Sequence, residues 1–318
     1  GHGHVFVGAN VPFGLVQVGP TSIPQEWDWC SGYHESDSTV IGFSHTHLSG
    51  TGIGDLFDVT VMPVVGEVTC ARGVEENPQS GLWSYADRSK EVVEPGYYSV
   101  PLSRYGITAE MTATSRVGLH RYTFPASDDA AVVFDLENGG CWDKATETGF
   151  TFSEDSTRLS GWRYSMGWAR DQKVYFVAEF SKPAKGITYL QPGEPDDSKM
   201  PRIAARYARV DFDMAEGEQL LMKVALSPVS IEGAEANLEA ELPGWNFEAT
   251  RLAADKAWND ELSKVRVETA DDAAKRIFYT ALYHTMVAPS EFCDANGDYR
   301  GADGQVRPNP GYKTYTTF

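Results

Sequence analysis

The residues best suited to chemistry gather in one segment, residues 10–58. Two tryptophans flank an aspartate in Trp27-Asp28-Trp29, and Cys30 follows directly. An indole face can stack on the apolar face of a pyranose ring, and a nearby carboxylate can accept two hydroxyl hydrogen bonds. Such a cluster is a candidate to bind a sugar, although composition alone does not favour this interpretation. The alternative is a core cluster with one hydrogen-bonded aspartate.

Two histidines in the same segment raise the question of a metal. His45-Thr46-His47 would place both rings on one face of a strand, and His34 and Asp55 are the nearest further ligands in sequence. Two ligands do not make a metal site, so we favour structural, hydrogen-bonded histidines over ligands. No metal ligand is assigned within this chain.

Other motifs are excluded by what they lack. The glycine-rich stretch 49–54 has no Lys-Ser/Thr pair to follow it, so we reject nucleotide binding. No nucleophile-elbow pentapeptide supports a catalytic serine. The segment Asp294–Asp298 fails the EF-hand spacing and is predicted to be a turn-rich loop, beside which Arg300 and Asp303 are candidates to line a site.

Composition narrows the class of protein. The chain has 318 residues, of which 45 are acidic and 27 basic, and its formal net charge is −18. Such a chain repels phosphate backbones, so nucleic acid is not expected as a partner. No apolar run approaches the ~18 residues of a membrane span, and no signal peptide is recognisable at the start. The four cysteines lack a CxxC spacing, which leaves one disulfide or four thiols open.

The elements that must position these residues change in kind near residue 230. Before it, β-branched and aromatic runs separated by turn residues predict many strands and an antiparallel sandwich. The predicted strands cover residues 97–102, 105–114, 117–124, 130–136, 150–152, 158–164, 173–180, 203–212 and 219–226. The sequence therefore predicts a mainly β protein with a large antiparallel β-sandwich.

Helical spacing follows at residues 230–242, 244–265 and 271–287. In the second helix Leu252, Trp258 and Leu262 are the expected buried positions, and Thr269 is expected to cap the third. The third helix has a broad apolar face that needs a partner. We divide the chain into a sandwich at 1–229, linker helices at 230–288 and the beginning of a further domain at 289–318, and we expect a longer protein of which this is the N-terminal part.

The chain resembles glycoside hydrolase family 92, the calcium-dependent exo-acting α-mannosidases. The resemblance rests on strings spread over the whole chain. They are Gly1-His2-Gly3-His4, Val11-Pro12-Phe13-Gly14, Trp27-Asp28-Trp29-Cys30-Ser31-Gly32-Tyr33, Gly42-Phe43-Ser44-His45-Thr46-His47-Leu48-Ser49-Gly50-Thr51-Gly52-Ile53-Gly54-Asp55, Pro95-Gly96-Tyr97-Tyr98-Ser99-Val100, Tyr299-Arg300-Gly301-Ala302-Asp303-Gly304 and Tyr315-Thr316-Thr317-Phe318.

This resemblance implies a fold and an activity. The fold is a galactose mutarotase-like supersandwich joined by linker helices to an (α/α)6 catalytic barrel, with the active site between them. The activity is inverting hydrolysis of terminal α-1,2-linked mannose from mannosides or N-glycans, in which a glutamic acid protonates the leaving oxygen and an aspartate activates water. Calcium binds the sugar hydroxyls. The two carboxylates and the calcium ligands are expected beyond Phe318, so this chain alone is expected to be inactive.

The resemblance also implies which residues touch the substrate. Phe13, Gly14 and Cys30 line the pocket for the terminal mannose, and Trp83 reaches the leaving-group side. Trp27, Asp28, His45 and His47 are candidates to contact the substrate or to support residues that do. The expected partners are a mannose-containing oligosaccharide and the chain's own C-terminal barrel, and the expected location is periplasmic or secreted. The alternative function is a stand-alone carbohydrate-binding sandwich without catalysis.

Overall fold

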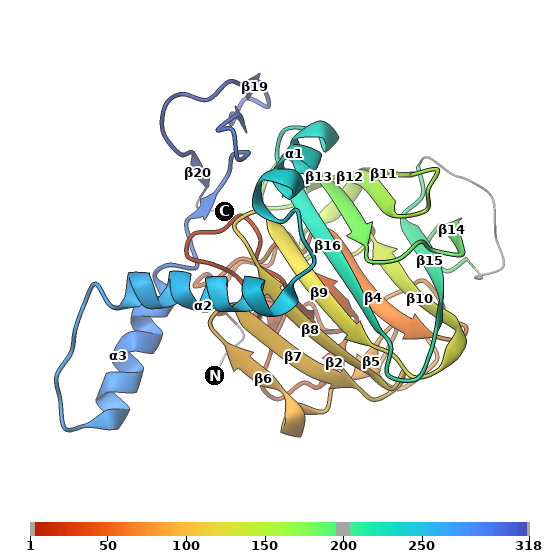
Figure 1. Ribbon diagram of the computed structural model, residues 1–318, viewed down its shortest axis with the longest axis horizontal. Helices are drawn as coiled ribbons and strands as arrows, with labels where there is room; N and C mark the ends of the chain where they lie inside the picture. Colours follow the sequence, from red (N-terminus) through yellow and green to blue (C-terminus); the bar gives the residue numbers. More distant parts are fainter. Residues whose placement is uncertain (1–3, 195–203, 317–318) are drawn as a thin grey trace.

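Two antiparallel sheets form most of the molecule in the computed structural model, which describes residues 4–194 and 204–316 (Figure 1). The smaller sheet has the strand order β1-β3-β4-β10-β15-β14. Its strands are β1 (Gly19–Thr21), β3 (Gly42–Ser44), β4 (Thr60–Val65), β10 (Ser127–Asp135), β15 (Tyr207–Met214) and β14 (Gly186–Leu190).

The larger sheet has the order β11-β12-β13-β16-β9-β8-β7-β6. Its strands are β11 (Lys144–Phe152), β12 (Arg158–Met166), β13 (Gln172–Phe180), β16 (Gln219–Ser227), β9 (Val117–Thr123), β8 (Ile107–Ala113), β7 (Tyr97–Leu102) and β6 (Val92–Glu94). Three short pairs complete the sheets: β2 (Thr39–Val40) with β5 (Ser84–Tyr85), β17 (Ser290–Glu291) with β20 (Tyr315–Thr316), and β18 (Tyr299–Arg300) with β19 (Val306–Arg307).

The core lies between the two sheets. Phe134 of the smaller sheet stacks on Phe176 of the larger one at 6.0 Å, and Phe180 meets Phe212 at 5.3 Å. All four rings are buried, which is the alternating inward pattern that the strand sequences predict. The predicted antiparallel β-sandwich is therefore confirmed.

Three helices follow the strands, as predicted: α1 (Ile231–Glu241), α2 (Phe247–Leu262) and α3 (Asp272–His284). Two short 3-10 helices, η1 (Trp27–Trp29) and η2 (Arg88–Lys90), lie in the loops of the sandwich. Helix α1 packs its buried Ala234 and Leu238 on the outer face of the larger sheet, against Val177 and Ala225. None of the helices in the described part of the chain is both long and apolar enough to cross a bilayer.

Two details of the helices differ from the prediction. Leu252 is 68% exposed, because α2 buries Phe247, Thr250, Ala254 and Trp258 and Leu252 lies off that face. Helix α3 is capped by Asp271, whose carboxylate accepts hydrogen bonds from two backbone amides, and Thr269 does not take that role. The exposed face of α3 is as predicted, with Ile277 70% exposed.

The boundaries of the strands differ by a few residues. The run predicted at 105–114 becomes a strand only at Ile107, because residues 103–106 form the turn from β7. Ile203, predicted to begin another strand, lies outside the described residues, and so do the first three and last two residues of the strings that carry the family resemblance. A larger difference concerns His45 and His47, because β3 ends at Ser44 and neither histidine belongs to a strand.

Candidate functional site

One end of the sandwich brings together part of the segment 10–58, the segment after α3, and two loops that the sequence did not single out. The loops after β3, between β10 and β11 and between β12 and β13 lie at this end, beside the segment that follows α3 (Figure 1). Gly304 of that last segment lies against Asp171 of the β12–β13 loop, since a Cβ on it would be 3.8 Å from the Asp171 carboxylate.

Phe13 joins the sandwich to the helical part of the chain. Its backbone N–H donates to the Met286 carbonyl at 2.8 Å, and its own carbonyl accepts from the Glu291 N–H at 2.8 Å. Its φ of 56° is an uncommon, strained value for a bulky residue, so both hydrogen bonds help to hold it. The ring is half-buried and meets Tyr315 edge-on at 6.5 Å. Phe13 is therefore fixed at the junction.

The neighbours of Phe13 also contact the helical part of the chain. The Asn10 carbonyl accepts a hydrogen bond from the buried Trp258 indole of α2 at 2.7 Å, and its side-chain oxygen accepts from the Tyr283 hydroxyl of α3 at 3.3 Å. Gly14 is buried, and a Cβ there would lie 3.2–3.4 Å from Val11 and Ser115. The segment 10–14 thus attaches α2 and α3 to the sandwich.

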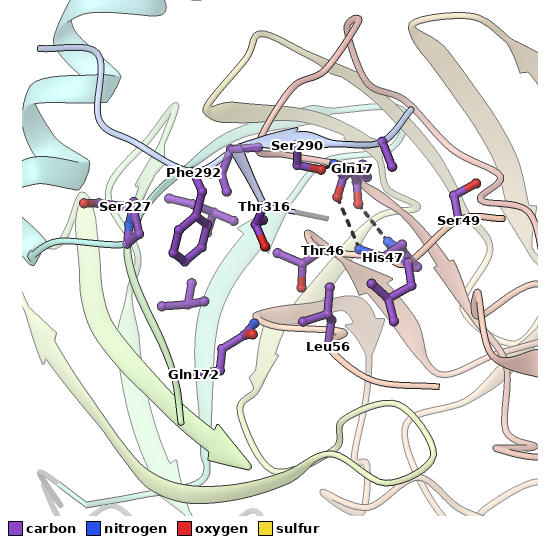
Figure 2. Close-up of a pocket in the computed structure, with 16 residues that line it drawn as sticks. Gln17, Thr46, His47, Ser49, Leu56, Gln172, Ser227, Ser290, Phe292 and Thr316 are labelled. Atoms are coloured by element: carbon purple, nitrogen blue, oxygen red, sulfur yellow. Dashed lines mark hydrogen bonds between the residues drawn. The ribbon is translucent and has the colours of Figure 1, made fainter. Parts of the chain in front are cut away.

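A narrow cavity lies beside this junction (Figure 2). Gln17, Thr46 and His47 form part of its wall, Gln172 lies at the end of the β12–β13 loop, and Thr316 belongs to the C-terminal segment. Its volume is about 40 Å³, enough for a few waters and far below the roughly 300–1,000 Å³ of ordinary ligand pockets. The cavity is therefore too small to hold a sugar ring as it stands.

His45 belongs to a buried chain of hydrogen bonds. Its Nδ1 contacts the Val59 carbonyl at 2.6 Å, its Nε2 contacts Nε2 of His120 at 2.8 Å, and Nδ1 of His120 contacts the Tyr122 hydroxyl at 2.8 Å. These contacts are satisfied together when both rings are neutral, with tyrosine donating to His120 and His120 donating to His45. Burial lowers the pKa of His45 to about 4, which keeps this arrangement neutral.

His47 is also buried and neutral. Its Nδ1 donates to the Gln17 carbonyl at 2.8 Å, and burial lowers its pKa to about 3. Its Nε2 has no hydrogen-bond partner among the described residues. The two rings thus take different partners, and the favoured interpretation of hydrogen-bonded structural histidines agrees with this geometry.

Asp58 accepts hydrogen bonds from two residues that line the cavity. One carboxylate oxygen accepts from the Thr46 hydroxyl and the Gln172 amide, both at 2.7 Å, and the other accepts from Arg163 at 2.7 Å. Arg163 is fully buried and also donates to Asp143. Burial raises the pKa of Asp143 to about 6, against the attraction of Arg163. One guanidinium is therefore the counter-charge of two buried carboxylates.

Trp27 and Asp28 lie at the surface of the same end. The Trp27 side chain is 60% exposed, and its indole rests on Gly52, where a Cβ would be 2.8 Å from the indole nitrogen. His4 meets Trp27 edge-on at 4.1 Å and lies 3.8 Å from the Asp28 carboxylate. An exposed ring beside an acid is the arrangement that a sugar-binding cluster requires.

Cys30 and Trp83 are both buried. The Cys30 thiol donates to the Thr51 carbonyl at 3.2 Å, and burial raises its pKa to about 11, so it is a neutral thiol beside the 49–54 loop. Trp83 packs on Gly73 and meets Tyr85 edge-on at 5.0 Å. Arg104 donates to its carbonyl at 2.9 Å, and none of these three partners is another predicted site residue.

The described residues do not form a metal site. They contain no group of three or more His, Cys, Asp or Glu side chains placed to hold a metal. The 294–298 segment is a turn, in which buried Asp294 accepts hydrogen bonds from Ser227 and Asn237. Arg300 is bound to the Pro228 carbonyl. The residues present therefore do not fit calcium on their own. The four cysteines are free thiols.

Several residues of this end were not found from the sequence. Arg163, Asp143 and Gln172 occupy ordinary strand or loop positions, and Trp142 and Trp168 are isolated tryptophans in turns. An arginine at an inward position of the alternating β12 pattern was the one available signal for a buried charge network.

The molecule is thus a large β-sandwich with an aromatic, acidic loop cluster, joined to helices. The sequence matches the glycosyl hydrolase family 92 N-terminal domain over residues 1–227 and the glycosyl hydrolase family 92 catalytic domain over residues 233–318. The chain belongs to glycosyl hydrolase family 92.

Solved structures of this family are similar over the whole chain. A family GH92 alpha-mannosidase from Bacteroides thetaiotaomicron has a TM-score of 0.91 and 35% identity, covering 99% of this chain and 43% of that one, and a complex of it with mannoimidazole has been solved. An inverting mannosidase from the same organism has a TM-score of 0.84 and 26% identity, over 100% of this chain and 41% of that one.

A relative described as an uncharacterized secreted glycosidase from Arthroderma benhamiae is 24% identical over 92% of this chain and 41% of its own length. The chain thus spans less than half the length of the relatives that it matches.

Proposed function

We propose that the protein containing this chain is an inverting exo-α-1,2-mannosidase, which removes terminal mannose from mannosides or N-glycans. The observation that carries the proposal is the similarity over 99% of the chain to an alpha-mannosidase whose mannoimidazole complex is known. An inverting relative supports the stereochemistry. The secreted relative supports a secreted or periplasmic location.

In this proposal the chain supplies one wall of the active site. Phe13 presents a half-buried ring at the junction with the helices, and Trp27 with Asp28 presents a ring and an acid at the surface. Gly14 and the neutral thiol of Cys30 are proposed to line the same pocket. These residues bind and orient the sugar, and the proton-transferring glutamic acid and aspartate belong to the part of the enzyme that follows Phe318.

Calcium belongs to that same following part of the enzyme. The described residues offer no set of three metal-binding side chains, so the proposal assigns no calcium ligand among them. When bound, a calcium ion would hold sugar hydroxyls through oxygen coordination.

The test compares the whole protein with the 318-residue chain on α-1,2-mannobiose, with and without a calcium chelator. The whole protein is expected to release mannose and to lose this activity on chelation, whereas the chain alone is expected to be inactive. Chelator-resistant hydrolysis by the 318-residue chain would refute the proposal. Mannose binding by the isolated chain without hydrolysis by the whole protein would favour the alternative, a carbohydrate-binding sandwich.

A further inference from the structure

Two exposed tryptophans form a stacked pair beside the candidate site. Trp142 lies in the loop between β10 and β11, and Trp168 lies in the loop between β12 and β13. Their ring centroids are 6.4 Å apart with an angle of 30° between planes, and the side chains are 54% and 55% exposed. Large aromatic side chains that remain this exposed together mark a binding surface more often than a solitary exposed ring does.

The backbone that carries both rings is firmly held. The Trp142 N–H donates to the Gly54 carbonyl at 3.3 Å, and the residue after Trp168 donates its N–H to the Asp55 carboxylate at 3.0 Å. Gly167 lies so close to Asp55 that a Cβ would be 2.2 Å from the carboxylate oxygen. A binding surface that is already ordered loses little conformational entropy when its ligand arrives.

The pair is coupled to the wall of the cavity. Asp143, next to Trp142, is bound by buried Arg163, and Arg163 also binds Asp58. Asp58 in turn holds Gln172, which lies four residues beyond Trp168. The same charge network therefore orients the two tryptophan loops and the cavity wall.

The surroundings of the rings fit a saccharide better than a protein surface. Lys144, Arg170 and Asp171 are exposed charged residues within three positions of the tryptophans. A pyranose has an apolar C–H face for a ring and an edge of hydroxyls for charged groups. The core of a protein–protein interface is instead depleted of charged residues.

We propose that Trp142 and Trp168 form a stacking platform for the sugar units of an oligomannoside beyond the terminal mannose. The proposal rests on the mannosidase function proposed above and adds to it a preference for longer chains. The platform contributes binding energy to an oligosaccharide and none to a mannoside that has only one sugar.

The experiment measures kcat/KM of the whole enzyme on an α-1,2-linked mannotriose and on α-mannosyl fluoride, whose leaving group has no ring to stack on the tryptophans. Trp142→Ala and Trp168→Ala are each expected to lower kcat/KM for the trisaccharide about tenfold, which is the scale of one stacking contact, and to leave kcat/KM for α-mannosyl fluoride unchanged. Met166→Ala is the matched control, because Met166 is 53% exposed at the end of β12, two residues before Trp168, but has no ring. Trp168→Phe is expected to restore part of the loss and remains informative if the alanine variants fold poorly.

Three results would contradict the platform. Unchanged kcat/KM for the trisaccharide would exclude stacking, and an equal loss on both substrates would indicate that the rings pack against the rest of the enzyme. A loss in Met166→Ala as large as in Trp168→Ala would indicate disturbance of the loop. No hydrolysis of either substrate by the unmodified enzyme would instead refute the mannosidase function itself, so the two failures are distinguishable.

Discussion

Replacing Arg163 with methionine tests the charge network on which the site depends. Its guanidinium donates to Asp58 at 2.7 Å, to Asp143 and to the Leu136 carbonyl at 2.9 Å, and all of its side chain is buried. Methionine keeps an unbranched apolar side chain in the site but leaves the two buried carboxylates without a counter-charge. Breaking a buried ion pair in this way costs about 3–5 kcal/mol.

The loss is measured as the free energy of unfolding in urea and as the thermal midpoint. At about 2–4 °C per kcal/mol for a domain of 150–250 residues, the midpoint is expected to fall by roughly 10 °C. Burial already raises the pKa of Asp143 to about 6, so its folded form takes up a proton before its unfolded form does as the pH falls. The cost of Arg163→Met is therefore expected to be smaller at pH 5 than at pH 7.

The control is the triple variant in which Asp58 and Asp143 are also replaced, by asparagine. Removing all three charges leaves no unpaired buried ion, so this variant is expected to recover most of the stability that Arg163→Met loses. A loss below about 1 kcal/mol in the single variant would refute the network, and so would a triple variant that is less stable than the single one.

Two further predictions concern stability. His45 and His47 are buried with pKa values of about 4 and 3, below their ordinary 6.5, so their contribution is complete above pH 6.5 and is lost as the pH falls towards 4. Each of these two histidines is expected to lower the free energy of unfolding, measured in urea, by roughly 2 kcal/mol as the pH falls from 7 to 5. Replacing His47 with phenylalanine should reduce this pH dependence. An unchanged pH dependence in that variant would contradict the prediction. Trp258→Ala should lower the free energy of unfolding by about 3–5 kcal/mol in the same assay, because it leaves a cavity and removes the hydrogen bond to the Asn10 carbonyl. Leu252→Ala, at a 68% exposed position, should change it by less than about 0.5 kcal/mol. Equal effects of the two variants would contradict the packing of α2.

The sandwich and the helices were predictable because their signals are local. Alternation in a segment such as 209–213 marks a half-buried strand, and 3.6-residue spacing marks a helix, whatever lies elsewhere in the chain. The errors occurred where a contact distant in sequence decides the outcome. Leu252 has helical spacing, but the sheet encloses Phe247, and Phe6 and Val287 enclose Trp258, so α2 buries that face instead.

The site was predictable only in part, for the same reason. The segment 10–58 shows its unusual composition directly, whereas Arg163 and Asp58 are joined across 105 residues of sequence. The tryptophan pair needs two loops to be brought together by Asp55, and no spacing within either loop indicates this. The strand predicted at His45 and His47 ends at Ser44, and the segment beside it has the positive φ values of Leu56, Phe57 and Val59, which an extended strand does not have.

The most direct test of the central claim is the configuration of the first product. The whole enzyme is mixed with α-1,2-mannobiose, and the anomeric protons of the released mannose are followed by NMR before mutarotation equilibrates them. An inverting mannosidase must release β-mannose first. Early release of α-mannose, or no release at all, would contradict the account.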